Sequence, residues 1–328
     1  TDARVYGLVK ITAVGTLNDD GKATTATVDV ITALHATTAT TLWTEGAWSS
    51  VKGFPRSVVI HGQRLWFGGT RTEPLRLWGS SVADFVNFRR STLDDASVSF
   101  TAAAQQSNAI QWLCSHGKDL VIGTSGDEWT LSGGTQEGPI TPTSVSVQRR
   151  SSYGSQYIPA LLLGEVVVFV QRGGRKLRQV APRADGIAWS AADLTVLAEH
   201  VAKAGVTQVA MMSFPFSLLW AVTNDGKLLG MTFEQEQNVF GWHVHSTDGQ
   251  IESVAVVYGG LSDEVWLQVN RNGTRTIERL DPVVFSQDFD APERLMYLDC
   301  AKRIELGTAS ATLDGLDHLE GRNVAILG

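Results

Sequence analysis

Two histidines separated by one residue, His243 and His245, have the type and spacing of a pair of metal ligands. In a β-strand, alternate side chains share a face, so both imidazoles would point to the same side. A structural zinc site needs four ligands and a catalytic site three. No cysteine or further histidine lies close to this pair in the sequence. We therefore interpret the pair as part of a polar outer strand and predict neither a metal nor another cofactor.

Three pairs of carboxylates could in principle act as the acid and base of a glycosidase. They are Asp94 with Asp95, Glu234 with Glu236, and Asp288 with Asp290. Glycoside hydrolysis requires two carboxyl groups that flank the scissile bond. All three pairs lie in polar connecting segments, where acidic side chains are usually solvated. We predict no catalytic residues and no enzymatic activity.

Two basic clusters are the remaining groups of chemically interesting side chains. One is Arg149-Arg150, and the other comprises Arg172, Arg175, Lys176 and Arg178. They could meet the acidic surface of a partner, although a solvated strand end is the usual role of such residues. No nucleophile elbow, P-loop or dinucleotide-binding glycine motif is present in the sequence. The motif Asn272-Gly273-Thr274 is interpreted as a hairpin turn.

The composition bounds the class of protein. The 328 residues carry a net charge of -7, with 43% hydrophobic and 19% charged residues. This charge argues against a surface that grips nucleic acid, but not against a conduit through which DNA passes. The sequence contains no run of about 18 apolar residues, so it predicts no transmembrane helix. We recognise no signal peptide at its N-terminus. Because the chain begins at Thr1 without an initiator methionine, we expect it to be part of a longer polypeptide.

The two cysteines, Cys114 and Cys300, lie within apolar runs. Two cysteines cannot build a disulfide framework, and a buried free thiol is the usual role in such a context. We predict that both stay reduced and unpaired, consistent with synthesis in a reducing compartment.

Internal repetition is the strongest signal in the sequence. Five segments share a plan of strand, tight turn, apolar strand, glycine-rich turn and third strand, and their central strands begin near Leu65, Leu120, Val166, Leu218 and Val265. The spacing of roughly 50 residues falls in the range of β-propeller blades. The central strands are almost continuously apolar, as expected of strands buried on both faces. The turns contain glycine or Asn-Gly, which adopt the positive φ of tight hairpins.

These features predict an all-β fold, a β-propeller of five or more antiparallel blades with flanking β segments. A β-sandwich is the alternative architecture. The expected domains are the end of a preceding small β domain (1–50), the propeller (51–285), and closing strands with the start of a following β domain (286–328). Candidates for a fourth strand in each blade are Phe85–Phe88, Val145–Arg149, Phe240–His245 and Leu295–Leu298.

One segment breaks the β pattern. The spacing of Leu194, Leu197, Ala198 and Val201 predicts a short helix between Asp193, as N-cap, and Gly205. The tryptophans recur at or beside the repeated strands, which favours packing between blades over a sugar-binding platform. Trp66, Trp220 and Trp266 are expected to be equivalent buried positions.

From about Trp43 onward, the amino-acid sequence resembles those of tail tube and nozzle proteins of short-tailed (podovirus-type) phages. The shared phrases are Trp48-SSVKGFPRSVVIHGQRLWFGGT, Trp78-GS, Asp84-FVNF, Gly123-TSGDEW, Gln148-RRSSYGS, Phe169-VQRGGRKLR, Asp193-LTVLAEH, Gly241-WHVHSTDG, Asp263-EVWLQV, Ile277-ERLDP and Gly315-LDHLEGRNVAILG. No catalytic motif is among them.

The resemblance implies a virion structural protein located in the phage tail and made in the cytoplasm of the bacterial host. It implies self-association into a ring, commonly a hexamer, that closes the tail below the adaptor protein. Docking of tail fibres and passage of DNA without sequence-specific binding are further roles that it implies, and no membrane anchor is expected. A propeller-type polysaccharide depolymerase and a carbohydrate-binding module are the alternatives.

Overall fold

The computed structural model describes residues 7–280 except residues 35, 37, 39–42, 44, 103–107, 135–137, 184–187, 236, 238 and 261, together with a few isolated positions after residue 307. The chain divides into two compact units, residues 1–47 and residues 48–328. The domain boundaries inferred from the sequence stay predictions. No helix in the described part of the chain is long and apolar enough to cross a membrane.

The first unit contains one antiparallel hairpin, formed by β1 (Leu8–Val14) and β2 (Ala26–Thr32). All side chains of both strands are exposed. The exposed residues include apolar ones, among them Ile11 and Val30. Two strands alone bury too little apolar surface for independent stability.

The second unit contains five antiparallel sheets, which we call blades 1 to 5. Blade 1 comprises β3 (Ser57–His61), β4 (Arg64–Gly68), β5 (Arg76–Gly79) and β6 (Val98–Thr101). Blade 2 comprises β7 (Ile110–His116), β8 (Asp119–Thr124), β9 (Glu128–Ser132) and β10 (Ser146–Ser151). Blade 3 comprises β11 (Leu161–Leu163), β12 (Val166–Val170), β13 (Leu177–Pro182) and β14 (Trp189–Asp193).

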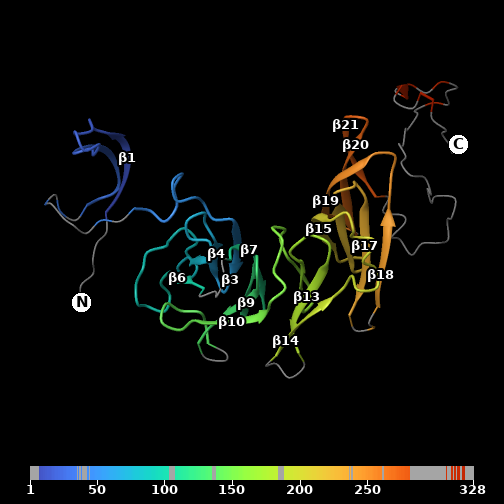
Figure 1. Ribbon diagram of the computed structural model, residues 1–328, viewed down its shortest axis with the longest axis horizontal. Helices are drawn as coiled ribbons and strands as arrows, with labels where there is room; N and C mark the ends of the chain where they lie inside the picture. The colour runs from blue at the N-terminus through green and yellow to red at the C-terminus, as the bar shows by residue number, and fades with distance from the viewer. Residues whose placement is uncertain are drawn as a thin grey trace. The chain divides into compact units, whose positions relative to one another are not determined.

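Blade 4 comprises β15 (Val206–Met212), β16 (Leu218–Thr223), β17 (Leu228–Glu234) and β18 (Val239–His245). Blade 5 comprises β19 (Gln250–Tyr258), β20 (Asp263–Arg271) and β21 (Thr274–Arg279) among the described residues. In every blade the strands follow one another in chain order as a meander (Figure 1). The first strand of each blade contacts the first strand of the next. The fold is thus the predicted all-β architecture of β-propeller blades.

Main-chain hydrogen bonds of one kind join each pair of successive blades. An N–H group at or just before the first strand of a blade donates to a carbonyl in the second turn of the preceding blade. The four pairs are Ile110 to Pro74 (2.9 Å), Ser155 to Thr124 (2.7 Å), Val206 to Gly174 (2.7 Å) and Ile251 to Gly226 (2.9 Å). Every blade is therefore held in register with the one before it.

The first turns of the blades carry a second set of contacts at the opposite end of the first strands. Nδ1 of His61 lies 2.8 Å from Oγ of Ser115 in blade 2, and Nε2 of His116 lies 2.7 Å from the carbonyl oxygen of Glu165 in blade 3. Between blades 4 and 5, Oδ2 of Asp263 accepts the Ser213 N–H at 2.7 Å. Polar groups at the turns thus link blades at both ends.

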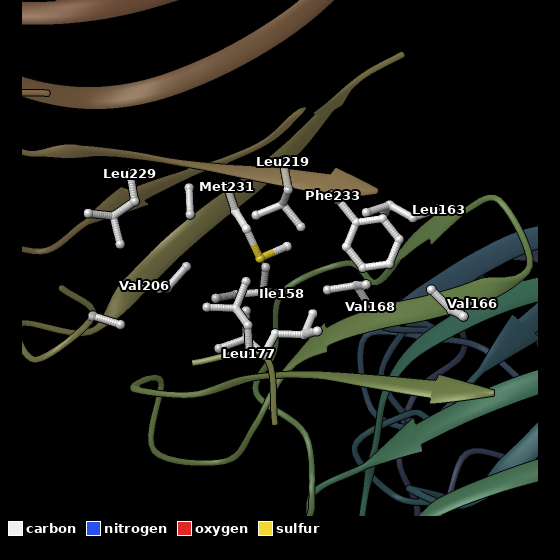
Figure 2. Packing of buried hydrophobic residues seen from close by; sticks show 14 of the residues in the cluster. Ile158, Leu163, Val166, Val168, Leu177, Val206, Leu219, Leu229, Met231 and Phe233 are labelled. Carbon is white, nitrogen blue, oxygen red and sulfur yellow. The ribbon is translucent and has the colours of Figure 1, made fainter. Parts of the chain in front are cut away.

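Four apolar clusters lie between the blades, one at each junction. The cluster between blades 3 and 4 includes Leu163 and Val168 on one side and Leu219, Met231 and Phe233 on the other (Figure 2). The central strands supply both sides of such clusters. In β12, Val167 and Phe169 pack toward blade 2, whereas Val166, Val168 and Val170 pack toward blade 4. The prediction that the central strands are buried on both faces is confirmed for β8, β12 and β16, whereas β4 and β20 alternate between buried and partly buried residues.

The predicted fourth strands are correct in two blades. β10 and β18 coincide with the predicted segments Val145–Arg149 and Phe240–His245. In blade 1 the prediction of Phe85–Phe88 is wrong, because β6 forms the fourth strand instead. Phe88 joins an aromatic cluster in which its ring centroid lies 5.5 Å from that of Trp48. β14 of blade 3 was not predicted, and Leu295–Leu298 lies outside the described residues.

The predicted helix at residues 191–205 is also wrong, and no α-helix occurs among the described residues. The segment ends β14 and then forms consecutive turns, with N–H groups of Ala198, Val201 and Gly205 donating to carbonyls three residues earlier. Oδ1 of Asp193 accepts both the N–H and the hydroxyl of Thr195, which fixes a local turn. Leu194 and Ala198 are buried, but Leu197 is 95% exposed, so no continuous helical face packs on the core.

The three tryptophans taken as equivalent share a register but not an environment. Trp66 and Trp220 are fully buried, each facing the next blade in the chain. Trp266 faces away from blade 4, because its strand neighbours Val265 and Leu267 occupy the junction with that blade. It is only partly buried.

Truncation of these tryptophans tests how much each side chain contributes to the free energy of unfolding. We expect Trp66→Ala and Trp220→Ala to lower the free energy of unfolding by about 3–5 kcal/mol each, as large buried aromatics do. Trp266→Ala should cost at most about 2 kcal/mol, because its ring is partly exposed. Urea denaturation of the three variants measures the difference. Equal losses at all three positions would contradict this assignment of the blade faces.

Tryptophan and glycine also pack closely across neighbouring strands. A Cβ atom at Gly123 would lie 2.0 Å from Cε2 of Trp112, and one at Gly79 would lie 2.9 Å from Cη2 of Trp66. Trp112 pairs with Gly123 in the β7–β8 register. The indole ring thus occupies the space that any larger residue at position 123 would need.

Gly123→Ala should therefore destabilise the protein by about 2–3 kcal/mol through overpacking. Gly241 in β18 provides the matched control, because no atom lies within 4 Å of a Cβ built there and its φ is not positive. We expect Gly241→Ala to change the stability by less than about 0.5 kcal/mol. Thermal and urea unfolding of both variants measures the contrast, and an unaffected Gly123→Ala variant would exclude the close packing.

Candidate interaction surface

Asp94 and Asp95 lie in an exposed loop of blade 1 that is held through its main chain. The guanidinium of Arg64 donates to the carbonyl of Asp94 at 2.7 Å, to that of Ala96 at 2.5 Å and to that of Ser80 at 2.6 Å. Arg64 is buried, and burial lowers its pKa while the charge of Asp95 raises it. Arg64 therefore anchors this loop through its carbonyl groups.

The other predicted carboxylates are placed only in part. Glu234 is an exposed residue at the end of β17 in blade 4. Glu236, Asp288 and Asp290 lie outside the described residues. The three carboxylates that are described, Asp94, Asp95 and Glu234, are thus divided between blades 1 and 4.

His243 and His245 share one face of β18, as the sequence predicted. Nδ1 of His243 lies 2.7 Å from Nε2 of His245, and both rings pack beside the buried Trp220, with centroids 5.6 and 5.5 Å away. Burial lowers the pKa of both histidines, and each neutral ring can serve the other as hydrogen-bond partner. Among the described residues, no three His, Cys, Asp or Glu side chains gather as metal ligands.

Cys114, in β7, is a free and buried cysteine, as predicted. Burial raises the pKa of its thiol to about 11, so it stays protonated. Cys300 lies outside the described residues, and its pairing state stays a prediction.

The basic clusters are partly neutralised by carboxylates of the same chain. Lys176 Nζ lies 2.9 Å from Asp193 and 2.6 Å from Glu199, and Arg178 lies 3.8 Å from Asp193. Arg149 lies 3.6 Å from Asp127. These contacts raise the pKa of Lys176, chiefly through its hydrogen bond to Glu199.

The structure brings the two basic clusters together through the segment that connects blades 2 and 3. The guanidinium of Arg178 lies 3.5 Å from the ring centroid of Tyr153, and the N–H of Arg172 donates to the Gly154 carbonyl at 2.8 Å. Arg149 pairs with Asp127, which directly follows Gly126. The Cα of Gly126 in turn lies 3.3 Å from a Cβ atom built at Gly154. Arg149 of β10 and Arg172 and Arg178 of blade 3 therefore all lie beside the connection.

The same connection also contacts the start of blade 1. The hydroxyl of Tyr157 donates to the carbonyl of Arg56 at 3.0 Å, and the guanidinium of Arg56 lies 4.5 Å from the Tyr157 ring centroid. Two exposed tyrosines are thus each stacked against an arginine from another blade. We call this the Arg–Tyr surface; it comprises Arg56, Arg149, Tyr153, Tyr157, Arg172 and Arg178. Sequence reasoning found Arg149, Arg172 and Arg178 but missed Arg56 and both tyrosines. The signal for the tyrosines was their place in a Ser/Gly-rich connection.

Glu128 is a buried carboxylate beneath this connection that sequence reasoning also missed. Its carboxylate accepts the hydroxyls of Ser151 and Ser155, the latter at 2.9 Å. Burial raises its pKa most, the charge of Asp127 raises it further, and the hydrogen bonds from Ser151, Ser155 and the Tyr153 N–H oppose the shift. Because Ser155 begins the connection to blade 3, Glu128 fastens that connection to blade 2.

No family model matches this sequence, and no curated protein matches it. Among solved structures, human WBSCR16 is 14% identical, with 74% of this chain and 71% of that chain covered and a TM-score of 0.41. The β-propeller domain of Cps50 (Swd1) from Myceliophteria thermophila is 7% identical, with 69% and 73% covered and a TM-score of 0.40. A protein from Lactobacillus plantarum is 8% identical, with 78% and 74% covered and a TM-score of 0.41. At these values the similarities say nothing about function.

Titration of Glu128 should be visible in the stability of the protein. Since its pKa is raised in the folded state, the native protein binds more protons than the unfolded chain above about pH 4.3, the ordinary pKa of glutamate. This contribution to stability is therefore present at lower pH and is lost as the pH rises through the folded pKa. The substitution Glu128→Gln removes this pH-dependent contribution to stability.

We expect the melting temperature of Glu128→Gln, relative to the unsubstituted protein, to increase as the pH rises from about 4.3 to neutrality. Glu234→Gln, at an exposed position, is the matched control and should show no such trend. Thermal melts at several pH values measure both differences. A constant difference for Glu128→Gln across the range would exclude a raised pKa.

Proposed function

We propose that this protein is a virion structural protein, a subunit of the tail tube or nozzle ring of a short-tailed phage. The observation that supports the proposal is the resemblance of the amino-acid sequence, from about Trp43 onward, to phage tail tube and nozzle proteins. In this role the protein acts by holding partners together. Its partners would be further copies of itself in a hexameric ring, the tail adaptor and the tail fibres, and DNA would pass through the ring.

The places where the shared phrases fall in the structure support this proposal. Gly123-TSGDEW contains the second turn of blade 2 and Glu128, and Gln148-RRSSYGS contains β10 and the start of the connection to blade 3. Phe169-VQRGGRKLR contains the turn whose Gly174 carbonyl accepts the N–H of blade 4. These three shared segments therefore lie at junctions between blades and at the Arg–Tyr surface.

A polysaccharide depolymerase or a carbohydrate-binding module is the alternative function. A carbohydrate-binding propeller would present aromatic rings at its surface, whereas Trp66, Trp112 and Trp220 are buried between blades. A depolymerase would need two carboxyl groups facing each other across a glycosidic bond. The described candidates Asp94 and Glu234 lie in different blades.

Two measurements on the full-length protein test the proposal. Negative-stain electron microscopy should show rotationally symmetric rings, whose subunit contacts each bury well over about 1,000 Å², as stable interfaces do. Incubation with capsular and cell-wall polysaccharides should release no reducing ends. A turnover that disappears in Asp94→Asn or Glu234→Gln would replace the structural role with the depolymerase.

A further inference from the structure

We infer that the Arg–Tyr surface is a docking site for a carboxylate-rich face of a protein partner. The inference does not depend on the proposed function, because it follows from side chains that the fold gathers from three blades. Arg56 precedes blade 1, Arg149 belongs to blade 2, and Arg172 and Arg178 belong to blade 3. Tyr153 and Tyr157 lie between them in the connection.

The surface presents its positive groups outward and keeps its negative groups back. The Arg149 side chain is 55% exposed, and Arg56 and Arg172 are also exposed. The carboxylates paired with Arg149 and Arg178 are largely covered, with side-chain exposures of 16% for Asp127 and 13% for Asp193. Glu199, which pairs with Lys176 outside the Arg–Tyr surface, is 60% exposed. An approaching molecule therefore meets guanidinium groups and tyrosine rings before it meets a carboxylate.

Stacking against arginines reduces the conformational freedom of the two exposed tyrosine rings, and the Arg178 side chain is itself only 11% exposed. Arg178 is held over Tyr153, and its Nε donates to Oε1 of Gln171 at 2.7 Å while its Nη1 donates to the Ala191 carbonyl at 2.9 Å. Arg56 is held over Tyr157. Groups that are ordered before binding lose less entropy when a partner arrives. Arginine and tyrosine are also the residues that most often dominate the energy of protein interfaces.

The charge of the whole chain favours a protein over a nucleic acid as the occupant. The chain has a net charge of -7, so a long phosphate polymer that extends beyond the Arg–Tyr surface would meet a repulsive field. A protein face touches only the local surface, where the exposed charge is positive.

A fluorescently labelled poly-L-glutamate peptide serves as the carboxylate probe for the complete chain. We expect it to bind at low salt and to be released as salt rises, because the contacts are ionic. Arg149→Gln combined with Arg172→Gln should weaken the apparent affinity at least about fivefold. Both arginines are exposed and cover neither tyrosine, so the melting temperature should stay unchanged.

Lys22→Gln combined with Arg90→Gln is the matched control, since it removes the same charge from exposed positions elsewhere and should leave binding unaltered. Tyr153→Ala should also weaken binding by removing an exposed, stacked ring from the surface, whereas Tyr153→Phe, which keeps the ring, should bind as the unsubstituted protein does. Equal weakening by the control pair would show that only net charge matters and would overturn the inference. Failure of the peptide to bind at low salt would do the same.

A double-stranded oligonucleotide of equal charge is the second probe. If it binds as tightly as the peptide and responds to Arg149→Gln and Arg172→Gln, the surface serves nucleic acid, and the inference is wrong. None of these outcomes depends on ring formation or on polysaccharide cleavage, so the docking surface and the proposed function can fail separately.

Discussion

The junction between successive blades is the constraint on which the rest of this structure depends. A single four-stranded sheet exposes two faces, and blades 2 to 4 bury both of them against the blade before and the blade after. The main-chain hydrogen bond from the start of one first strand to the preceding second turn, as from Val206 to Gly174, sets how the sheets stack. Because both faces are buried, the central strands must be apolar at every position, as Val166–Val170 is. Glycines such as Gly123 follow from the same requirement, since an indole ring crosses the sheet there.

This constraint explains which elements the sequence could predict. The central strands were found because continuous apolarity and tight turns are properties of neighbouring residues. The fourth strands were found only in part, because they lie at the outer edge and need little apolarity. Trp189–Asp193 was missed for that reason. The segment after Asp193 has helical spacing of apolar residues, but the Asp193 carboxylate caps a local turn at Thr195 instead. Local hydrogen bonding by short polar side chains competes with helix formation in this way.

The candidate surface was less predictable, because it is made by contacts between distant residues. Arg56 and Tyr157 are separated by 101 positions and meet only through the stacking of blades. Glu128 reads as an ordinary acidic residue in a polar turn, and its burial depends on Ser155 in the following connection. Sequence composition identifies the groups that are available. The order of the blades decides which carboxylate is buried, which arginine is stacked and which remains exposed.

The face of blade 5 that points away from blade 4 shows how far a position in the repeat depends on its neighbour. Trp66 and Trp266 share a register, yet Trp66 is sealed by blade 2, whereas Trp266 lies on a face with ion pairs. On that face Arg279 bonds Glu264 and covers the Trp266 ring, with its guanidinium 5.6 Å from the ring centroid. A ring shielded by a charged side chain keeps part of its apolar surface from water. The same residue type therefore stabilises a junction at one position and the boundary of the array at another, because the partner differs.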